Sequence, residues 1–245
     1  MPAPQKLECV VERIADHGER VYTLDLRPDR PVPRFRAGQF LHLALDPYDP
    51  TGFWPESRVF SIASSPEDRG AVRITYAVHG QFTERMASEI EEGTRVWIKM
   101  PYGDFVIDSP GDVVLFAGGT GVSAFTAFLE ALSPAADGRS YVLGYGARTA
   151  PLLIYKEAVD RCAARVPALD VTYFVETGPI PSSRIGDAAR WLPGRVSVDA
   201  LWTQLPRPAE SHFYISGPPA MLKAIAADLR ARSVAPEAIH IDAWE

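Results

Sequence analysis

Hydrophobic and polar residues alternate in short runs through the first hundred residues, and a period of two is typical of β-strands. Turn-forming residues separate the runs, and helical periodicity is scarce there. The expected strands are LECVVERIA, VYTLDLRP, QFLHLALD, RVFSIASS, AVRITYAV and RVWIKM. Six strands at this spacing predict a small antiparallel barrel.

One helix interrupts these strands. Phe82, Met86 and Ile90 recur at intervals of four residues, and Gly93 is a plausible stop. Gly80 and Thr83 stand at the helix start, where a glycine admits a ligand, free N–H groups point outward and a hydroxyl is at hand. This helix start either binds phosphate or is a simple N-cap.

The pattern changes near Ser109, after which apolar strands alternate with helical segments. The expected strands are VVLFA, SYVLGYG, DVTYFVE, HFYIS and AIHIDAW, with a long connection after the third. That alternation predicts a parallel sheet covered by helices. We therefore expect an all-β plus α/β fold, with a six-stranded antiparallel barrel domain over residues 1–109 and a parallel-sheet domain over 110–245.

The strand RVFSIASSP combines a charge, a ring and a hydroxyl at Arg58, Phe60 and Ser61. Arginine offers a planar fork of donors for pyrophosphate, an aromatic ring packs on a flat ligand, and serine exchanges a hydrogen bond with a ring heteroatom. The stretch is thus either a ligand-binding strand or a half-buried strand with a surface arginine.

Two turns of the second half follow apolar strands and open helices. The first, Gly119-Thr120-Gly121-Val122-Ser123-Ala124, is a GxGxxA pattern preceded by Gly118, at the position where a dinucleotide pyrophosphate binds. The second is Ser216-Gly217-Pro218, followed by residues suited to the first turn of a helix. Each is a ligand-facing turn or a purely structural one.

An acidic residue that would bind a ribose hydroxyl is missing after the second strand of this half. Arg148 is available there instead, with Arg184 as a second candidate, and an arginine suits a ribose 2′-phosphate. Both are otherwise solvated loop charges. The pattern favours NADPH over NADH.

Composition narrows the classes of partner. A formal net charge of −6 argues against nucleic acid. Cys9 and Cys162 lie too far apart in sequence for a zinc or iron-sulfur site built from this chain alone, and we expect no metal. The N-terminus lacks the pattern of a secretion signal, and glycines interrupt the most apolar window, so we expect a cytoplasmic protein without a membrane span.

Six motifs in order resemble those of the ferredoxin-NADP+ reductase superfamily, whose members bind FAD and NAD(P)H. The motifs are RVFS at 58–61, GQFT at 80–83, PYGDF at 101–105, AGGTGVSAF at 117–125, YGAR at 145–148 and SGPPAM at 216–221. The resemblance covers nearly the whole chain, and it implies FAD rather than FMN because the glycine-rich motif of the FMN branch is not evident.

The resemblance also implies roles for individual residues. Arg58 would bind the FAD pyrophosphate, Phe60 would pack on the flavin and Ser61 would bond near N5. Further FAD contacts would come from Val59, Gly80, Gln81, Phe82 and Thr83. The nicotinamide nucleotide, NADP or NAD, would lie on Gly118, Gly119, Thr120, Gly121, Arg148, Gly217 and Pro218.

Three positions depart from the family pattern. Phe60 replaces a tyrosine and loses its hydroxyl, and Ser216 replaces a cysteine near the hydride path. The family's acid-x-aromatic ending is Asp242-Ala243-Trp244, with one extra residue behind it. Ser61, Ser216 and Trp244 are the expected catalytic residues, with Trp244 as a lid on the flavin.

The expected function is hydride transfer from NAD(P)H to FAD, followed by electron transfer to a separate acceptor. That acceptor is a ferredoxin, a flavodoxin, an oxygenase component or a small oxidant. Two alternatives stay open: a nucleotide-binding regulatory or interaction module without turnover, and a flavin-free dehydrogenase. Bound yellow pigment that NAD(P)H bleaches would exclude both.

Overall fold

The computed structural model describes residues 3–133, 138–181 and 189–243 of the 245-residue chain. The chain divides into two compact units, Met1–Val106 and Ile107–Glu245. Each unit is described below by itself.

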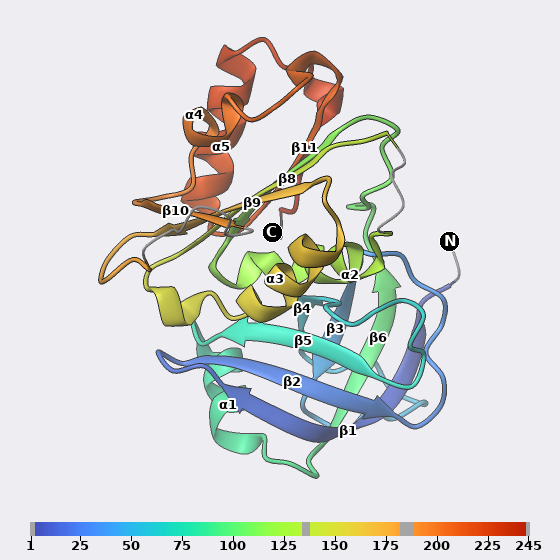
Figure 1. Cartoon of the computed structure of the whole chain (residues 1–245). Coiled ribbons are helices and arrows are strands. Elements are labelled where there is room, and N and C mark those ends of the chain that lie inside the picture. Colours follow the sequence, from blue (N-terminus) through green and yellow to red (C-terminus); the bar gives the residue numbers. More distant parts are fainter. Residues whose placement is uncertain (1–2, 134–137, 182–188, 244–245) are drawn as a thin grey trace. The chain divides into compact units, whose positions relative to one another are not determined.

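The first unit is a nearly closed antiparallel barrel of six strands in the order β4-β3-β6-β1-β2-β5 (Figure 1). A hydrogen bond from the Ala63 amide to the Arg73 carbonyl, 2.8 Å long, connects the chain beyond β4 to β5. The strands are β1 (Gln5–Asp16), β2 (Val21–Pro28), β3 (Phe40–Ala44), β4 (Ser57–Ser61), β5 (Val72–Ala77) and β6 (Arg95–Tyr102).

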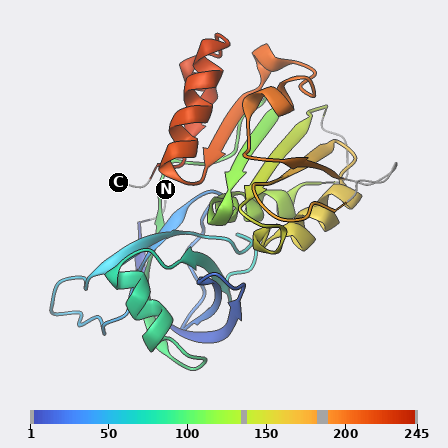
Figure 2. The same ribbon diagram turned by 90° about the vertical axis from the view of Figure 1, so that its left-hand side faces the viewer.

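The alternating residues of these strands form the barrel core because every second side chain points inward. Leu7, Leu41 and Ile98 are among the core side chains that are at most 2% exposed. Helix α1 (Gln81–Glu89) adds Phe82 and Met86 to the same core and so packs against the barrel (Figure 2).

The second unit contains a six-stranded parallel sheet in the order β10-β9-β8-β7-β11-β12. The strands are β7 (Val113–Gly118), β8 (Tyr141–Ala147), β9 (Leu169–Val175), β10 (Ala189–Pro193), β11 (His212–Ser216) and β12 (Ile239–Ile241). The helices are α2 (Ser123–Ala131), α3 (Lys156–Arg165), α4 (Val198–Trp202) and α5 (Pro219–Ala231), with short 3-10 turns Gly119–Val122, Ala150–Leu152, Pro208–Glu210 and Pro236–Ala238.

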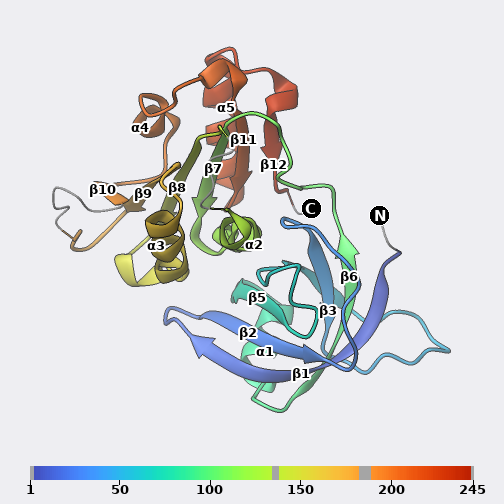
Figure 3. The ribbon, with the colours of Figure 1, turned by 45° about the vertical axis from the view of Figure 1, so that its right-hand side comes forward.

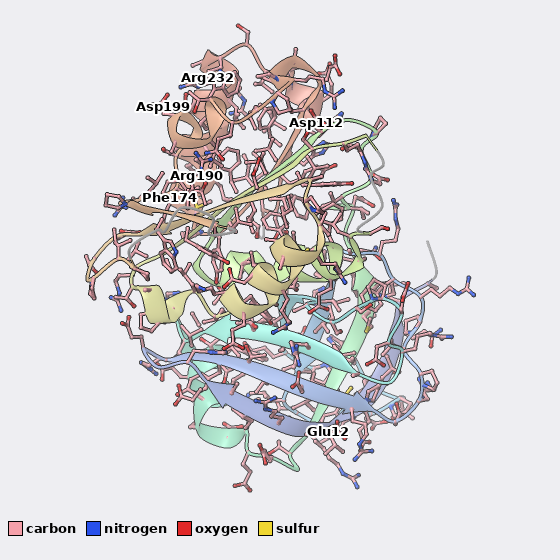
Figure 4. All side chains as sticks on the ribbon, viewed as in Figure 1. Glu12, Asp112, Phe174, Arg190, Asp199 and Arg232 are labelled. Carbon is pink, nitrogen blue, oxygen red and sulfur yellow. The ribbon has the colours of Figure 1, made fainter. Side chains whose placement is uncertain are left out.

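Helices cover both faces of this sheet, with α2 and α3 on one face and α4 and α5 on the other (Figure 1). Central strands β7 and β8 are buried throughout, as strands covered on both faces must be. Asp199 of α4 forms an ion pair with Arg232 at the end of α5, and both are labelled in Figure 4. The expected fold class is therefore confirmed.

Strand β10 was not predicted, since it lies in the stretch expected to be a long connection. It pairs with β9 at the edge of the sheet, and its residues are exposed or half-buried. An edge strand needs no continuous apolar run, so its sequence, ARWLP, carries little strand signal.

Candidate functional site

The start of β4 and the start of α1 meet at Arg58. The exposed Arg58 guanidinium lies over the Phe82 ring, 5.1 Å from its centroid. It also forms an ion pair with Glu56 at 2.9 Å and donates to the Ser57 carbonyl at 2.9 Å. The arginine is thus held beside the first turn of a helix with its charge still facing water.

The start of α1 is closed by a side chain. The Thr83 hydroxyl oxygen accepts hydrogen bonds from the His79 amide at 2.9 Å and the Gly80 amide at 3.1 Å, and the hydroxyl donates to the Gly80 carbonyl at 3.0 Å. The next three amides, of residues 81–83, precede the first intrahelical bond, which runs from Glu84 to Gly80. These N–H groups and the positive end of the helix dipole suit an anion.

Phe60 and Ser61 lie in different surroundings. The Phe60 ring belongs to the barrel core and meets Tyr76 edge-on, with centroids 6.3 Å apart. Ser61 is half-buried and pairs across the strands with Phe40, while Val59 pairs with His42. Within the described part of the chain, the Ser61 hydroxyl makes no hydrogen bond, so it is available to a ligand.

In the second unit, the order in which the chain adds strands to the sheet reverses between β7 and β11. From β7 the chain adds β8, β9 and β10 on one side, and then returns to place β11 and β12 on the other. Ligands of open parallel sheets bind beyond the carboxyl ends of the strands at such a point. Both glycine-containing turns lie there, since Ser216 is level with Ala117.

The two turns touch through their backbones. A Cβ on Gly121 would lie 2.5 Å from the Ser216 carbonyl oxygen, and one on Gly217 would lie 3.1 Å from the Gly118 Cα. A Cβ on Gly118 would lie 2.5 Å from Met221 Sδ. Packing between the turns therefore accounts for these three glycines.

Gly119 differs from its neighbours. Its φ of +54° is in the left-handed region, and a Cβ there would meet nothing within 4 Å. A glycine with open space before it leaves the backbone accessible, as a phosphate-binding turn requires. Thr120 beside it is half-buried.

Ser216 has a partner that the sequence did not predict. Its hydroxyl donates to Asp242 Oδ2 at 2.8 Å, and both residues are buried, at 2% and 4% exposure. The Asp242 amide donates to the Ile215 carbonyl at 2.9 Å. Asp242 appeared in the sequence only as part of an acid-x-aromatic ending, so its contact with Ser216 was missed.

Arg148 follows β8 directly and is exposed, and its carbonyl accepts hydrogen bonds from the amide and hydroxyl of Thr177. Pro218 precedes α5 and is exposed as well. Arg184 and Trp244 lie outside the described residues, so their expected roles remain predictions.

The two cysteines lie in different units, and both are buried. Over the residues described, no group of three or more metal-ligating side chains comes together. No helix in those ranges is long and apolar enough to cross a membrane.

The model of a family described as the oxidoreductase NAD-binding domain matches residues 115–227. The reductase component DmpP of phenol 2-monooxygenase from Pseudomonas sp. CF600 is 32% identical over 162 residues, which is 64% of this chain and 44% of the relative. The flavohemoprotein of Bacillus subtilis is 24% identical over 95% of this chain and 58% of its own length. The chain thus spans about half the length of these relatives.

Solved structures share the fold. The Amycolatopsis cytochrome P450 reductase GcoB superposes with a TM-score of 0.81 at 23% identity, covering 98% of this chain and 69% of the other. The ferredoxin NADP+ reductase of Neisseria gonorrhoeae, solved with bound FAD and NADP, superposes with a TM-score of 0.75 at 18% identity and covers 99% of both chains.

Proposed function

We propose that the chain is a member of the ferredoxin-NADP+ reductase superfamily and an FAD-dependent oxidoreductase that oxidises NAD(P)H and passes the electrons to a separate acceptor. We assign FAD to residues 1–109 and the nicotinamide nucleotide to residues 110–245. The observation that carries the proposal is the position of Arg58 over Phe82, at the start of α1. A flavin-free dehydrogenase has no use for this arrangement in a barrel.

The residues of the first unit fit the diphosphate and ring of FAD. Arg58 and the amides of Gln81, Phe82 and Thr83 would hold the pyrophosphate, with Gly80 leaving space beside them. Val59 and the free hydroxyl of Ser61 would contact the flavin, whereas the Phe60 ring lies in the barrel core. When bound, FAD supplies the capacity to take two electrons as a hydride and release them singly, which no side chain has.

The residues of the second unit fit a dinucleotide. The open turn at Gly119, with Gly118, Thr120 and Gly121, would hold its pyrophosphate, and Gly217 and Pro218 would lie against its nicotinamide half. Arg148 would bind a ribose 2′-phosphate, so we propose NADPH as the preferred coenzyme.

Ser216 and Asp242 would set the polar surroundings of the nicotinamide. The Ser216 hydroxyl donates its proton to Asp242 Oδ2, with 2.8 Å between the two oxygen atoms. The lone pairs of the Ser216 oxygen therefore stay available to accept a hydrogen bond from a ligand. The hydrogen bond to Asp242 also fixes the orientation of the buried Ser216 side chain, so that a bound ligand would meet this hydroxyl in one orientation. The Trp244 lid and a cytoplasmic location stay predictions.

The acceptor proposed is a ferredoxin, a flavodoxin, an oxygenase component or a small oxidant. Support comes from the relative that is a reductase component of a monooxygenase. This chain covers 44% and 58% of the lengths of the two relatives named above.

Anaerobic rapid mixing tests the proposal. Protein reconstituted with FAD is mixed with NADPH or NADH, and the blue absorption band of the flavin is followed. We expect rapid bleaching, faster at equal concentration with NADPH. Failure to retain FAD after reconstitution would contradict the FAD assignment, and retained flavin that neither nucleotide bleaches would contradict the enzyme assignment.

A further inference from the structure

A buried polar side chain of the first unit, that of Gln39, lies next to the strand proposed to contact the flavin. Gln39 directly precedes β3 and is 1% exposed. The Arg36 amide donates to its Oε1 at 2.9 Å, and its Nε2 donates to the Gly103 carbonyl at 2.9 Å. These two neighbours fix the orientation of the side-chain amide, because a backbone N–H needs an acceptor and a carbonyl needs a donor.

The backbone of Gln39 binds a third segment. Its carbonyl accepts a hydrogen bond from the Ile62 amide at 3.0 Å, and its own amide donates to the Arg36 carbonyl at 3.1 Å. Ile62 is completely buried and directly follows Ser61, the last residue of β4. Gln39 therefore joins the chain ahead of β3, the chain beyond β4 and the chain beyond β6.

Two glycines let these segments approach closely, and strands β3 and β6 lie side by side (Figure 3). Gly38 has a φ of +95°, and a Cβ there would lie 2.2 Å from the Phe105 carbonyl oxygen. Gly103 has a φ of +91°, and a Cβ there would lie 2.6 Å from the Phe40 ring. Glycine adopts such a backbone readily and other residues avoid it. The turns on either side of Gln39 are thus packed directly against each other.

Ser61 is connected to this arrangement in two directions. Along the chain, its neighbour Ile62 is held by the Gln39 carbonyl. Across the sheet, Ser61 pairs with Phe40, whose ring stacks on Tyr102 of β6 with centroids 5.6 Å apart. The backbone position of Ser61 therefore depends on the segments that Gln39 holds together.

Hydrogen bonds define a position more closely than apolar packing does. Burying an amide group is unfavourable unless its polar atoms are bonded, and both polar atoms of the Gln39 side chain are. A satisfied polar network makes a core rigid, whereas the hydrophobic effect has no direction. An apolar residue of the same volume would fill this place without fixing the three segments relative to one another.

We propose that Gln39 is a positioning residue for hydride transfer, because its contacts with Ile62 and Gly103 determine where Ser61 presents its hydroxyl to the flavin. This inference rests on the proposed function. The step converts NAD(P)H and FAD into NAD(P)+ and FADH−, with no other reactant. Gln39 itself would touch neither of them. A misplacement of about 1 Å can lower the rate of such a step about 100-fold.

Two substitutions test the contacts of Gln39. Gln39→Leu removes both side-chain hydrogen bonds at similar volume. Gln39→Glu keeps an acceptor for the Arg36 amide, but a carboxylate cannot donate to the Gly103 carbonyl. The matched controls are Gln204→Leu and Gln204→Glu in the second unit, where the half-buried Gln204 donates from Nε2 to the Ala200 carbonyl at 2.8 Å.

Anaerobic rapid mixing of the FAD-loaded full-length protein with NADPH measures the limiting rate of flavin bleaching. At about pH 8.5 we expect both Gln39 variants to lower this rate roughly 10- to 100-fold, because the reacting groups are misplaced rather than removed. The Kd for FAD and the half-saturating NADPH concentration should stay within about threefold of the wild type. The Gln204 variants should stay within about twofold in all three quantities.

Lowering the pH should rescue Gln39→Glu even if Gln39→Leu fails to fold. Burial raises the pKa of a carboxyl group, and the protonated group both accepts from the Arg36 amide and donates to the Gly103 carbonyl. Relative to the wild type at the same pH, the rate of this variant should therefore recover between about pH 8.5 and about pH 6. Gln204→Glu should show no such recovery.

A double-mutant cycle asks whether Gln39 acts through Ser61. In the Ser61→Ala background, we expect Gln39→Glu to lower the limiting rate by less than about twofold, because the hydroxyl that it misplaces is already absent. A residue that only stabilises the barrel would lower the rate equally in both backgrounds.

Amide hydrogen exchange of the FAD-free protein measures the contact without any reaction. At about pH 8.5, Gln39→Glu should speed exchange of the Ile62 amide at least about 10-fold relative to the wild type. The buried Val11 amide, which donates to the Thr94 carbonyl at 2.9 Å, should be unchanged and serves as the reference.

The proposal would be overturned by unchanged bleaching rates in the Gln39 variants, by equal effects of the Gln204 variants or by additive effects in the cycle. It would also fail if Ile62 and Val11 exchanged alike, or if the effect were confined to FAD affinity. A wild-type protein that does not retain FAD, or whose FAD NADPH does not bleach, would instead refute the proposed function.

Discussion

At the scale of single residues, the candidate site depends on side chains that are held by neighbours rather than left free. Arg58 is held by Glu56 and the Phe82 ring, Thr83 closes its own helix start, and Ser216 is bound to Asp242. Preorganised groups of this kind lose little freedom when a ligand binds.

Replacing Arg58 with alanine should weaken FAD binding. A charged hydrogen bond to a phosphate contributes about 1.5–3 kcal/mol, so we expect the Kd for FAD to rise roughly 10- to 100-fold. Arg27→Ala is a matched control, because Arg27 is 57% exposed and paired with Glu12, as Arg58 is 52% exposed and paired with Glu56. Quenching of flavin fluorescence measures both Kd values, and an equal effect of the two substitutions would contradict the role of Arg58.

The sequence motifs located these residues but not their contacts. RVFS and GQFT are 22 residues apart, and only the fold brings Arg58 over Phe82. Ser216 and Asp242 are 26 residues apart, and Gln39 and Gly103 are 64 apart, with no periodicity that connects them. Contacts between distant segments depend on strand order, which single-sequence patterns do not encode.

At the scale of elements, segments with a strong hydrophobic periodicity were predicted correctly, and segments with a weak periodicity were missed. The barrel strands and α1 were expected from alternation and from the spacing of Phe82 and Met86. Strand β10 and the five-residue α4 were missed, because a polar edge strand and a single short turn of helix carry little pattern.

The start of β7 provides a test of electrostatics between elements. The Asp112 side chain is 2% exposed and accepts hydrogen bonds from Arg207 at 2.8 and 3.1 Å and from the Ser140 amide at 2.8 Å. The Arg207 hydrogen bond is the main cause that holds the Asp112 pKa below its ordinary value of 3.8. Asp112, labelled in Figure 4, precedes β7 directly. Its hydrogen bonds connect this position with the residue before β8 and with the segment that leads into β11.

A carboxyl group with a lowered pKa stabilises the fold above its unfolded pKa, and this contribution is lost as pH falls through the folded pKa. We therefore expect Arg207→Gln to lower the free energy of unfolding at pH 7, and the difference from the wild type to shrink below pH 3.8. Urea unfolding at several pH values measures it, with the exposed Arg190→Gln as control. A difference independent of pH would contradict this assignment.

At the scale of the whole molecule, the chain forms two compact units, each with its own core and one buried cysteine. Burial, with Asp29 and Glu8 nearby, raises the pKa of the Cys9 thiol to about 12, and burial raises that of Cys162. The thiolate is the reactive form, so both thiols should be inert in the folded protein.

Thiol labelling can therefore report the opening of each unit separately. At pH 8 we expect iodoacetamide to modify either cysteine at least about 10³-fold more slowly than a free thiol, and both promptly in denaturing urea. Mass spectrometry of peptides distinguishes Cys9 from Cys162 at intermediate urea concentrations. Fast labelling of Cys9 without urea would show that the barrel core is not closed around it.

The contact between the β7 and β11 turns has a consequence for engineering coenzyme choice. A Cβ atom added to Gly121 would lie only 2.5 Å from the Ser216 carbonyl oxygen. The contact between the two segments therefore has no room for one additional methyl group. A loop transplanted from a relative into one side alone would collide with the other. Chimaeras should therefore exchange residues 117–122 and 216–221 together, because the backbones of the two segments pack directly against each other.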